Sequence, residues 1–263
     1  MSRLFRIFIC AAIVPVLASP VAAAQGTTTS SEDQAAINKA LAELAAWQNS
    51  AARKTLQKNK AAYGSTPQFK TAWALLEIQE GGAKDKATAT QGLKSLSQTA
   101  QSNKTDPVAS YYEGELLYQQ SKNKEANGAW QAAANQAAKL VATDPTDATA
   151  QYYLGAALVR TKKFGPARDA LRLAVRGGFD PAMVNYQIGL SHMFSEQWKE
   201  ALEAFNLGLS VEPRFAPMYF WRAMAWDKLG RKDNMLLDLD QFLKLAPNAP
   251  EAGKAKTILK SAS

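Results

Sequence analysis

One fixed spacing recurs through the second half of the chain and constrains its fold more than any other feature. Gly155, Gly189 and Ala223 are evenly spaced, since 189 − 155 and 223 − 189 are both 34. A residue of small or moderate size follows each of them at the same offset of +12: Ala167, Ala201 and Met235. A period of this length is typical of a stack of similar units, none of which can bury its apolar face alone. The sequence therefore predicts one elongated array of units.

Each unit is expected to contain two antiparallel helices. In one of them, apolar residues recur at helical spacing over residues 148–163 and again over 167–176, on either side of Gly165 and Pro166, which should break the helix. Two helices approach closely only where side chains are small. We therefore expect Gly155 and its equivalents to mark the helix crossings.

This unit resembles the tetratricopeptide repeat, and residues 182–213 carry the resemblance best through Ile188-Gly189, Ala201, Phe205, Gly208 and Pro213. The resemblance implies an all-α, right-handed superhelical solenoid of antiparallel helix pairs. It places tetratricopeptide-like repeats at residues 106–146, 147–181, 182–215 and 216–249, the first of them stretched in its second helix. Residues 33–105 are expected to form divergent helical hairpins, and residues 250–263 a C-terminal capping helix.

The first two dozen residues have the pattern of a secretory signal peptide. Arg3 and Arg6 precede an apolar run at 7–17, and small residues lead up to Ala24. We expect cleavage after Ala24, a disordered leader over 25–32, and a periplasmic or secreted mature chain without an integral membrane segment. Cys10 would be removed with the signal, so no disulfide is expected.

The positive charge is concentrated in the N-terminal third. The formal net charge of the whole chain is +8. Between Asp33 and Lys104 there are 10 basic and 5 acidic residues, against 19 and 17 over residues 105–263. This excess indicates either attraction to an anionic envelope surface or a solvated helix surface. Nucleic acid is not expected as a partner, since the chain is expected to be exported and basic pairs such as Arg53-Lys54 are isolated, without dense interleaving of basic and aromatic residues.

The resemblance also implies where a partner would bind, because the first helices of such repeats line a concave groove. Carried over position by position, the groove residues are Tyr111, Tyr118, Tyr152, Arg160, Met183, Tyr186, Met193, Phe220 and Lys228. An aromatic row of this kind would offer apolar contact area together with hydroxyl groups. The alternative is that these rings pack between repeats, and the sequence leaves both interpretations open for Tyr152 and Tyr186.

Little in the sequence favours catalysis. The chain has one histidine, His192, at a position where the repeat buries a large side chain, and no catalytic residue, metal ligand or cofactor is predicted. The resulting hypothesis is a non-catalytic, exported scaffold that binds a protein or extended peptide in cell-envelope assembly. The alternative is a periplasmic protein that binds or cleaves carbohydrate or peptidoglycan. The sequence identifies neither the partner nor the oligomeric state.

Overall fold

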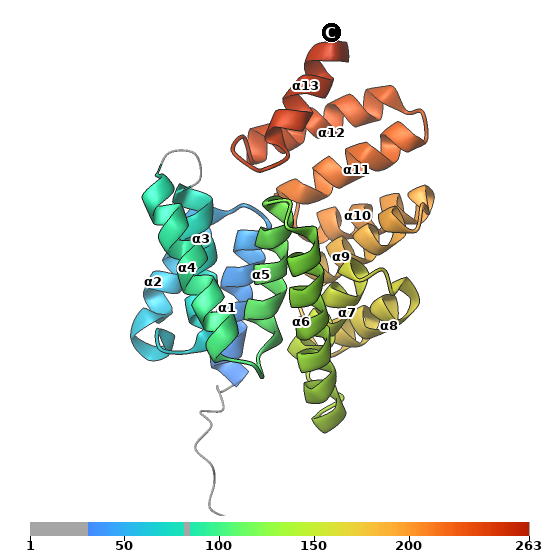
Figure 1. The fold of residues 1–263 in the computed structure, drawn as a ribbon. Coiled ribbons are helices and arrows are strands. Elements are labelled where there is room, and N and C mark those ends of the chain that lie inside the picture. The colour runs from blue at the N-terminus through green and yellow to red at the C-terminus, as the bar shows by residue number, and fades with distance from the viewer. Residues whose placement is uncertain (1–30, 82–84, 263) are drawn as a thin grey trace, which may run out of the picture.

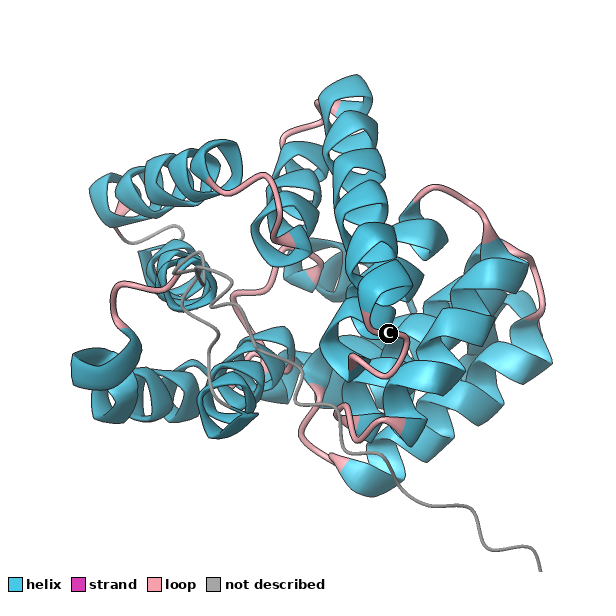
Figure 2. Cartoon of the chain, turned by 90° about the horizontal axis from the view of Figure 1, so that it is seen from below, coloured by secondary structure: helices cyan, strands magenta, loops and turns pink. Residues whose placement is uncertain are grey.

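The structure is a computed structural model that describes residues 31–81 and 85–262. The predicted signal peptide and most of the predicted leader lie outside the described residues. Within those residues the chain forms helices joined by short connections, without a strand (Figure 2). The helices are α1 (Ser31–Ala45), α2 (Asn49–Tyr63), α3 (Pro67–Gly81), α4 (Lys86–Ser102), α5 (Pro107–Gln119), α6 (Asn123–Thr143), α7 (Ala148–Arg160), α8 (Phe164–Arg176), α9 (Pro181–Phe194), α10 (Trp198–Val211), α11 (Ala216–Lys228), α12 (Lys232–Leu245) and α13 (Ala252–Ala262).

Consecutive helices pair into hairpins that stack along the chain, from α1–α2 to α11–α12, with α13 after the last pair (Figure 1). The predicted fold class, an all-α solenoid of the tetratricopeptide type, is confirmed. One apolar core runs through the stacked hairpins, and a second apolar cluster lies between α11, α12 and α13.

The glycines of the first helices mark the crossings, as the spacing predicts. Gly155 on α7 faces Leu171 on α8, and Gly189 on α9 faces Phe205 on α10. A Cβ placed on Gly189 would overlap the Phe205 ring, so only a glycine allows this approach. The offset from the small residue to the large one is the same in both pairs.

The turn inside the hairpins has a common geometry. In the turn after α7, the Lys162 N–H donates to the Val159 carbonyl and the Lys163 N–H to the Leu158 carbonyl, which satisfies carbonyl groups at the helix end. Lys162, at the centre of this turn, has a positive φ. The residues at the four equivalent positions also have a positive φ: Trp47, Ser121, Glu196 and Gly230.

Some predicted helix bounds are wrong. α7 ends at Arg160, and the turn that follows covers residues 161–163. Gly165 and Pro166, which were expected to break the helix, lie in the first turn of α8. A proline is tolerated there because the first backbone N–H groups of a helix have no partner inside it. At the other end of the chain, α1 already begins at Ser31, inside the predicted leader.

The first hairpin also contacts the later repeats, a closure that the period does not predict. The Asn38 side chain of α1 donates a hydrogen bond of 3.0 Å to the Thr149 hydroxyl at the start of α7. Trp47, in the α1–α2 turn, packs against the apolar cluster of α11, α12 and α13. The first hairpin therefore contacts both α7 and the C-terminal apolar cluster, and we call the boundary between this hairpin and the later repeats the seam.

Candidate protein-interaction surface

The predicted groove residues lie on the first helices of four repeats, α5, α7, α9 and α11, but they differ in how exposed they are. Five of the nine are in the core, each at most 7% exposed: Tyr111, Tyr152, Met183, Met193 and Phe220. For these five, the interpretation that the side chains pack between repeats describes the structure. Their burial leaves almost no surface on them for a partner to contact.

Aromatic packing explains the burial of Tyr152. Its ring stacks on Phe179, with centroids 4.2 Å apart, and meets the edge of Tyr153 at 5.0 Å. Tyr111 in turn meets Tyr153 edge-on at 5.7 Å. Since these rings come from α5, α7 and the α8–α9 connection, they join neighbouring repeats.

The hydroxyl groups of these two tyrosines are also engaged within the chain. Gln187 on α9 is buried, and its side-chain N–H group lies 3.0 Å from the Tyr111 hydroxyl and 3.4 Å from the Tyr152 hydroxyl. Burial raises the pKa of both phenols well above the ordinary value. Gln187 therefore links α5, α7 and α9. The two tyrosine hydroxyls accept hydrogen bonds within the chain, whereas in a binding groove they would be open to a partner protein.

Arg160, at the end of α7, is half-buried. Its guanidinium forms a bidentate ion pair with the Glu115 carboxylate on α5, with an Nε to Oε1 distance of 2.7 Å. It also lies 5.7 Å from the ring centre of Trp130 and 5.9 Å from that of Phe194. Burial opposes the charge of Arg160, but the Glu115 carboxylate and the Tyr111 and Tyr186 side chains together outweigh it, and the pKa of Arg160 is raised.

Tyr186, in the middle of α9, lies near this ion pair. Burial raises the pKa of its phenol, against the opposing effect of the Arg160 charge, and the Trp221 side chain on α11 is its hydrogen-bond partner. Burial likewise raises the pKa of Glu251, just before α13, whose carboxyl group interacts electrostatically with Arg160. We call Glu115, Arg160, Tyr186, Trp221 and Glu251 the inner cluster.

The last two predicted residues are exposed but do not belong to the inner cluster. Tyr118, at the end of α5, is 56% exposed and packs one side of its ring against Trp130. Lys228, at the end of α11, extends over the Trp198 ring. Phe194, at the end of α9, is also exposed, at 38%. These three exposed side chains thus all lie at the ends of first helices.

Sequence reasoning missed three members of the inner cluster. Glu115 lies four residues after Tyr111, and Trp221 directly follows Phe220, both of which were singled out, so a helical projection of the first helices could have found them. Glu251 comes from outside the repeats, and no repeat position predicts it.

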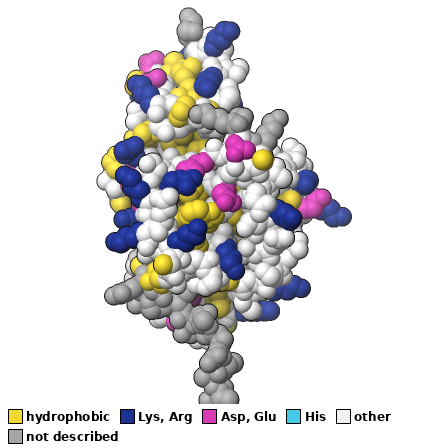
Figure 3. Space-filling view, turned by 90° about the vertical axis from the view of Figure 1, so that its left-hand side faces the viewer, with side chains coloured by type: hydrophobic (Ala, Val, Ile, Leu, Met, Phe, Trp, Pro, Cys, Tyr) yellow, Lys and Arg dark blue, Asp and Glu magenta, His cyan; other side chains and the backbone are white. Residues whose placement is uncertain are grey.

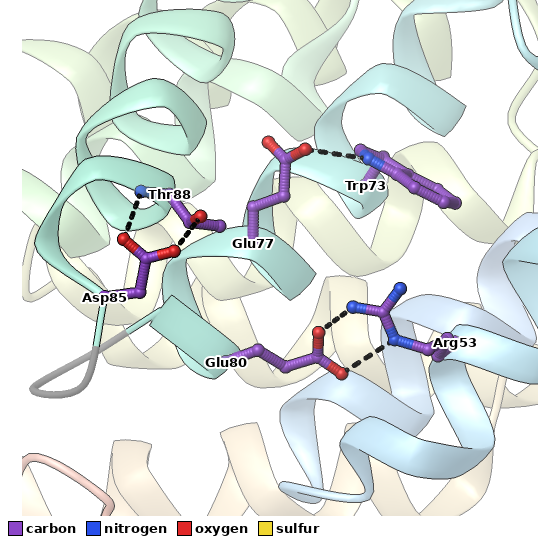
Figure 4. A network of polar contacts seen from close by, with 6 residues as sticks. All are labelled: Arg53, Trp73, Glu77, Glu80, Asp85 and Thr88. Atoms are coloured by element: carbon purple, nitrogen blue, oxygen red, sulfur yellow. Dashed lines mark hydrogen bonds and ion pairs between the residues drawn. The ribbon is translucent and has the colours of Figure 1, made fainter.

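The basic N-terminal third forms an exposed face. Figure 3 shows Lys and Arg side chains spread over the side of the molecule that includes α2 and α4. Much of the acidic charge in this part of the chain is engaged locally: Glu80 pairs with Arg53, Glu77 accepts from Trp73, and Asp85 caps α4 (Figure 4).

The one histidine of the chain has a neighbouring polar side chain. His192 is partly exposed, and its Nδ1 lies 2.8 Å from the Gln197 side chain. No group of three or more potential metal ligands occurs in the part of the chain that the structure describes. Among the same residues, no helix has the length and apolar character needed to cross a membrane.

Solved structures with similar architecture are tetratricopeptide proteins. The chain is similar to TTC0263, a thermophilic protein with these repeats in Thermus thermophilus, with a TM-score of 0.52, 18% identity and coverage of 75% of this chain and 98% of that one. It is also similar to MamA from Desulfovibrio magneticus, with a TM-score of 0.42, 20% identity and coverage of 68% and 96%. No known family profile and no curated protein matches the sequence. The first likeness shows that the fold is that of a tetratricopeptide solenoid.

Proposed function

We propose that this chain with a tetratricopeptide fold is an exported, non-catalytic scaffold that binds a protein or extended peptide. The observation that carries the proposal is the inner cluster, in which four first helices and the segment before α13 bring a paired arginine, two carboxyl groups and two aromatic side chains together. Rigid aromatic and arginine side chains are enriched among the residues that dominate binding energy at protein interfaces.

The binding surface in this proposal differs from the row of tyrosines expected from the sequence. It consists of the accessible parts of the inner cluster with Tyr118, Phe194 and Lys228 around them. Phe194 supports this placement, because it is an exposed aromatic ring that lies beside the Arg160 guanidinium. A partner that covers Phe194 would remove apolar area from water and enclose the neighbouring ion pair.

Crosslinking inside cells tests the proposal. A photo-reactive amino acid replaces Phe194, and a matched variant carries it at Lys199, an exposed residue on the second helix of the same repeat. We expect a defined protein adduct from position 194 and none from position 199. The same diffuse set of products from both positions would contradict the proposed surface.

Export and a role in the cell envelope form part of the same proposal and rest on the N-terminal pattern. Fractionation of cells followed by N-terminal sequencing of the mature chain tests them. A mature protein that begins at Gln25 in the periplasmic or extracellular fraction is expected. A full-length chain in the cytoplasmic fraction would contradict this part of the proposal and leave the binding surface to be judged by crosslinking.

A further inference from the structure

A cavity of about 520 Å³ lies at the seam where the first hairpin meets the last repeats. We call it the seam pocket. It is bounded on one side by the α1–α2 turn and the start of α2, and on the other by Arg214 and the end of α12 with the residues that follow it. Its lining includes Trp47, Asn49, Lys54, Gln79, Arg214 and Asn248. The pocket is separate from the inner cluster and shares no residue with it.

Trp47 is an unusual residue for its position in the α1–α2 turn, and the turn geometry alone does not explain it. Trp47 has a φ of 62°, a left-handed conformation that is sterically unfavourable for a bulky side chain. The equivalent turns have Ser121, Lys162, Glu196 and Gly230, none of which is large and apolar. The turn therefore does not need a tryptophan. Its indole instead packs on the C-terminal apolar cluster and lines the pocket.

Two amide groups in the lining have acceptor atoms without a partner. Gln79 donates a 3.1 Å hydrogen bond from its Nε2 to the Leu44 carbonyl, which fixes the orientation of the side chain, while its Oε1 is buried and accepts no hydrogen bond. Asn49 Oδ1 is buried in the same way. Both oxygen atoms are enclosed by the protein, so the amide side chains that the pocket offers to a ligand are the others in its lining, Gln48 and Asn248.

The pocket also carries positive charge. Lys54 and Arg214 are exposed, and neither forms an ion pair with any residue in the described ranges. Arg53, next to Lys54, is by contrast neutralised by Glu80 (Figure 4). The two cations at the pocket are therefore available to an anionic ligand.

We propose that the seam pocket binds an acidic saccharide of the uronate type. Such a sugar has a face that stacks on an indole ring, several hydroxyl groups that hydrogen-bond to amide side chains such as Gln48 and Asn248, and one carboxylate for the cations. The cavity volume is within the range of small-molecule sites. An extended peptide fits the seam pocket less well, since two turns bound it.

Calorimetry with two matched probes tests the assignment on the full mature chain. We expect a trimer of galacturonic acid to bind with a Kd in the range of roughly 10 μM to 1 mM, and the neutral galactose trimer to bind at least about tenfold more weakly. Tryptophan fluorescence should change on titration with the acidic trimer. Equal binding of both trimers, or no heat with either, would overturn the proposal.

Charge variants place the site. Arg214→Ala and Lys54→Ala should each weaken binding of the galacturonic acid trimer by about tenfold or more. Lys58→Ala removes an exposed lysine from the same helix as Lys54 but outside the pocket lining, and should bind like the unmodified chain. Loss of affinity in all three variants alike would indicate charge attraction without a site and would overturn the proposal.

Trp47→Gly tests the ring without disturbing the turn, because Gly230 occupies the equivalent position in the last repeat. This variant should keep its helical circular dichroism and lose the fluorescence response to the acidic trimer. An unchanged affinity would overturn the stacking role. Binding of a short acidic peptide at the same site in preference to the sugar would also overturn the assignment. Crosslinking at Phe194 is independent of every one of these outcomes.

Discussion

The α1–α2 hairpin and the α9–α10 repeat differ in sequence but have the same internal geometry. In α9–α10, Gly189 lies seven positions before the left-handed turn residue and faces Phe205 on the second helix. In α1–α2, Ala40 lies seven positions before Trp47, and Leu56 follows Ala40 at the same offset as Phe205 follows Gly189. Ala40, Leu56, Gly189 and Phe205 are all buried. The repeat is thus defined by distances from its turn.

The α3–α4 hairpin shows where that rule ends. One close approach is at Gly92 on the second helix, where an added Cβ would meet the Ala74 carbonyl and the Ile78 side chain, and another is at Gly81 at the end of α3, where it would meet the Ala89 backbone. In the α5–α6, α7–α8 and α9–α10 hairpins a glycine on the first helix faces a large side chain on the second. A hairpin can therefore stack in this solenoid with a different crossing. Stacking on the neighbouring hairpins depends on the buried face of a hairpin and not on how its two helices cross.

The largest expected effect comes from emptying the two equivalent crossings. Leu56→Ala should lower the free energy of unfolding by about 3 kcal/mol and Phe205→Ala by about 4 kcal/mol, because each leaves a cavity in a buried site. Chemical denaturation followed by circular dichroism measures both. If the seam joins the first hairpin to the stack, each variant unfolds in one transition.

A second, separate transition in Leu56→Ala alone would contradict that unity. It would show that α1–α2 unfolds independently of the later repeats, as neighbouring units in a solenoid are able to do. Leu207→Ala, an exposed position on α10 at 60% exposure, serves as the matched control and should change stability little.

The next effect sharpens the comparison at the small residue itself. Gly189→Ala should destabilise the chain by about 2 kcal/mol, because its new methyl group would clash with the Phe205 ring. The first hairpin already has Ala40 at this position, opposite a leucine. Gly189→Ala combined with Phe205→Leu should therefore recover part of the loss. A double variant no more stable than Gly189→Ala would show that the two hairpins do not share a crossing.

These pairs also show how far the sequence predicts the fold. The fixed period identified the repeats after residue 106, but Gly114 does not follow Ala40 by a whole number of periods. The first hairpin therefore appeared divergent. The step from Ala40 to Ala52, which equals the step from Gly155 to Ala167, would have revealed the same pattern.

The candidate site was harder to predict than the fold. The sequence placed Tyr152 on a first helix, but its neighbours Phe179 and Gln187 decide that its ring is buried and its hydroxyl engaged. Gln187 belongs to the next repeat along the stack, and Phe179 lies in the connection that leads into it. Their contacts depend on how the repeats rotate against each other, which a motif read within one repeat does not contain. The contact of Trp47 with the C-terminal cluster has the same origin.

A pH-dependent effect separates repeats that share another feature, the aspartate before the first helix. Asp106 caps α5 by accepting from the Val108 N–H, as Asp147 and Asp180 cap α7 and α9. Asp106 is the buried one, and burial raises its pKa to about 6. Its folded pKa lies above the unfolded value, so the stability that it supports is present below about pH 4 and is lost as the pH rises through about 6.

Asp106→Asn keeps the capping oxygen and removes the ionisation. At pH 8 it should raise the free energy of unfolding by about 2 kcal/mol, and near pH 4 it should change it little. Thermal unfolding over this pH range provides the measurement, with Asp180→Asn as the control for a less buried cap. A gain that is the same at both pH values would show that the carboxyl group is not the cause.

The smallest expected effect tests whether glycine is needed only where helices cross. Gly128 lies inside α6, is exposed, and a Cβ added there would meet no atom within 4 Å. Gly128→Ala should raise the free energy of unfolding by about 0.7 kcal/mol, because alanine reduces the flexibility of the unfolded chain and favours the helix. A Cβ added to Gly114, the first-helix glycine of the same repeat, would instead overlap the Trp130 ring, so Gly114→Ala should have the opposite sign. Two changes of the same sign in denaturation experiments would show that close packing does not decide where this solenoid needs glycine.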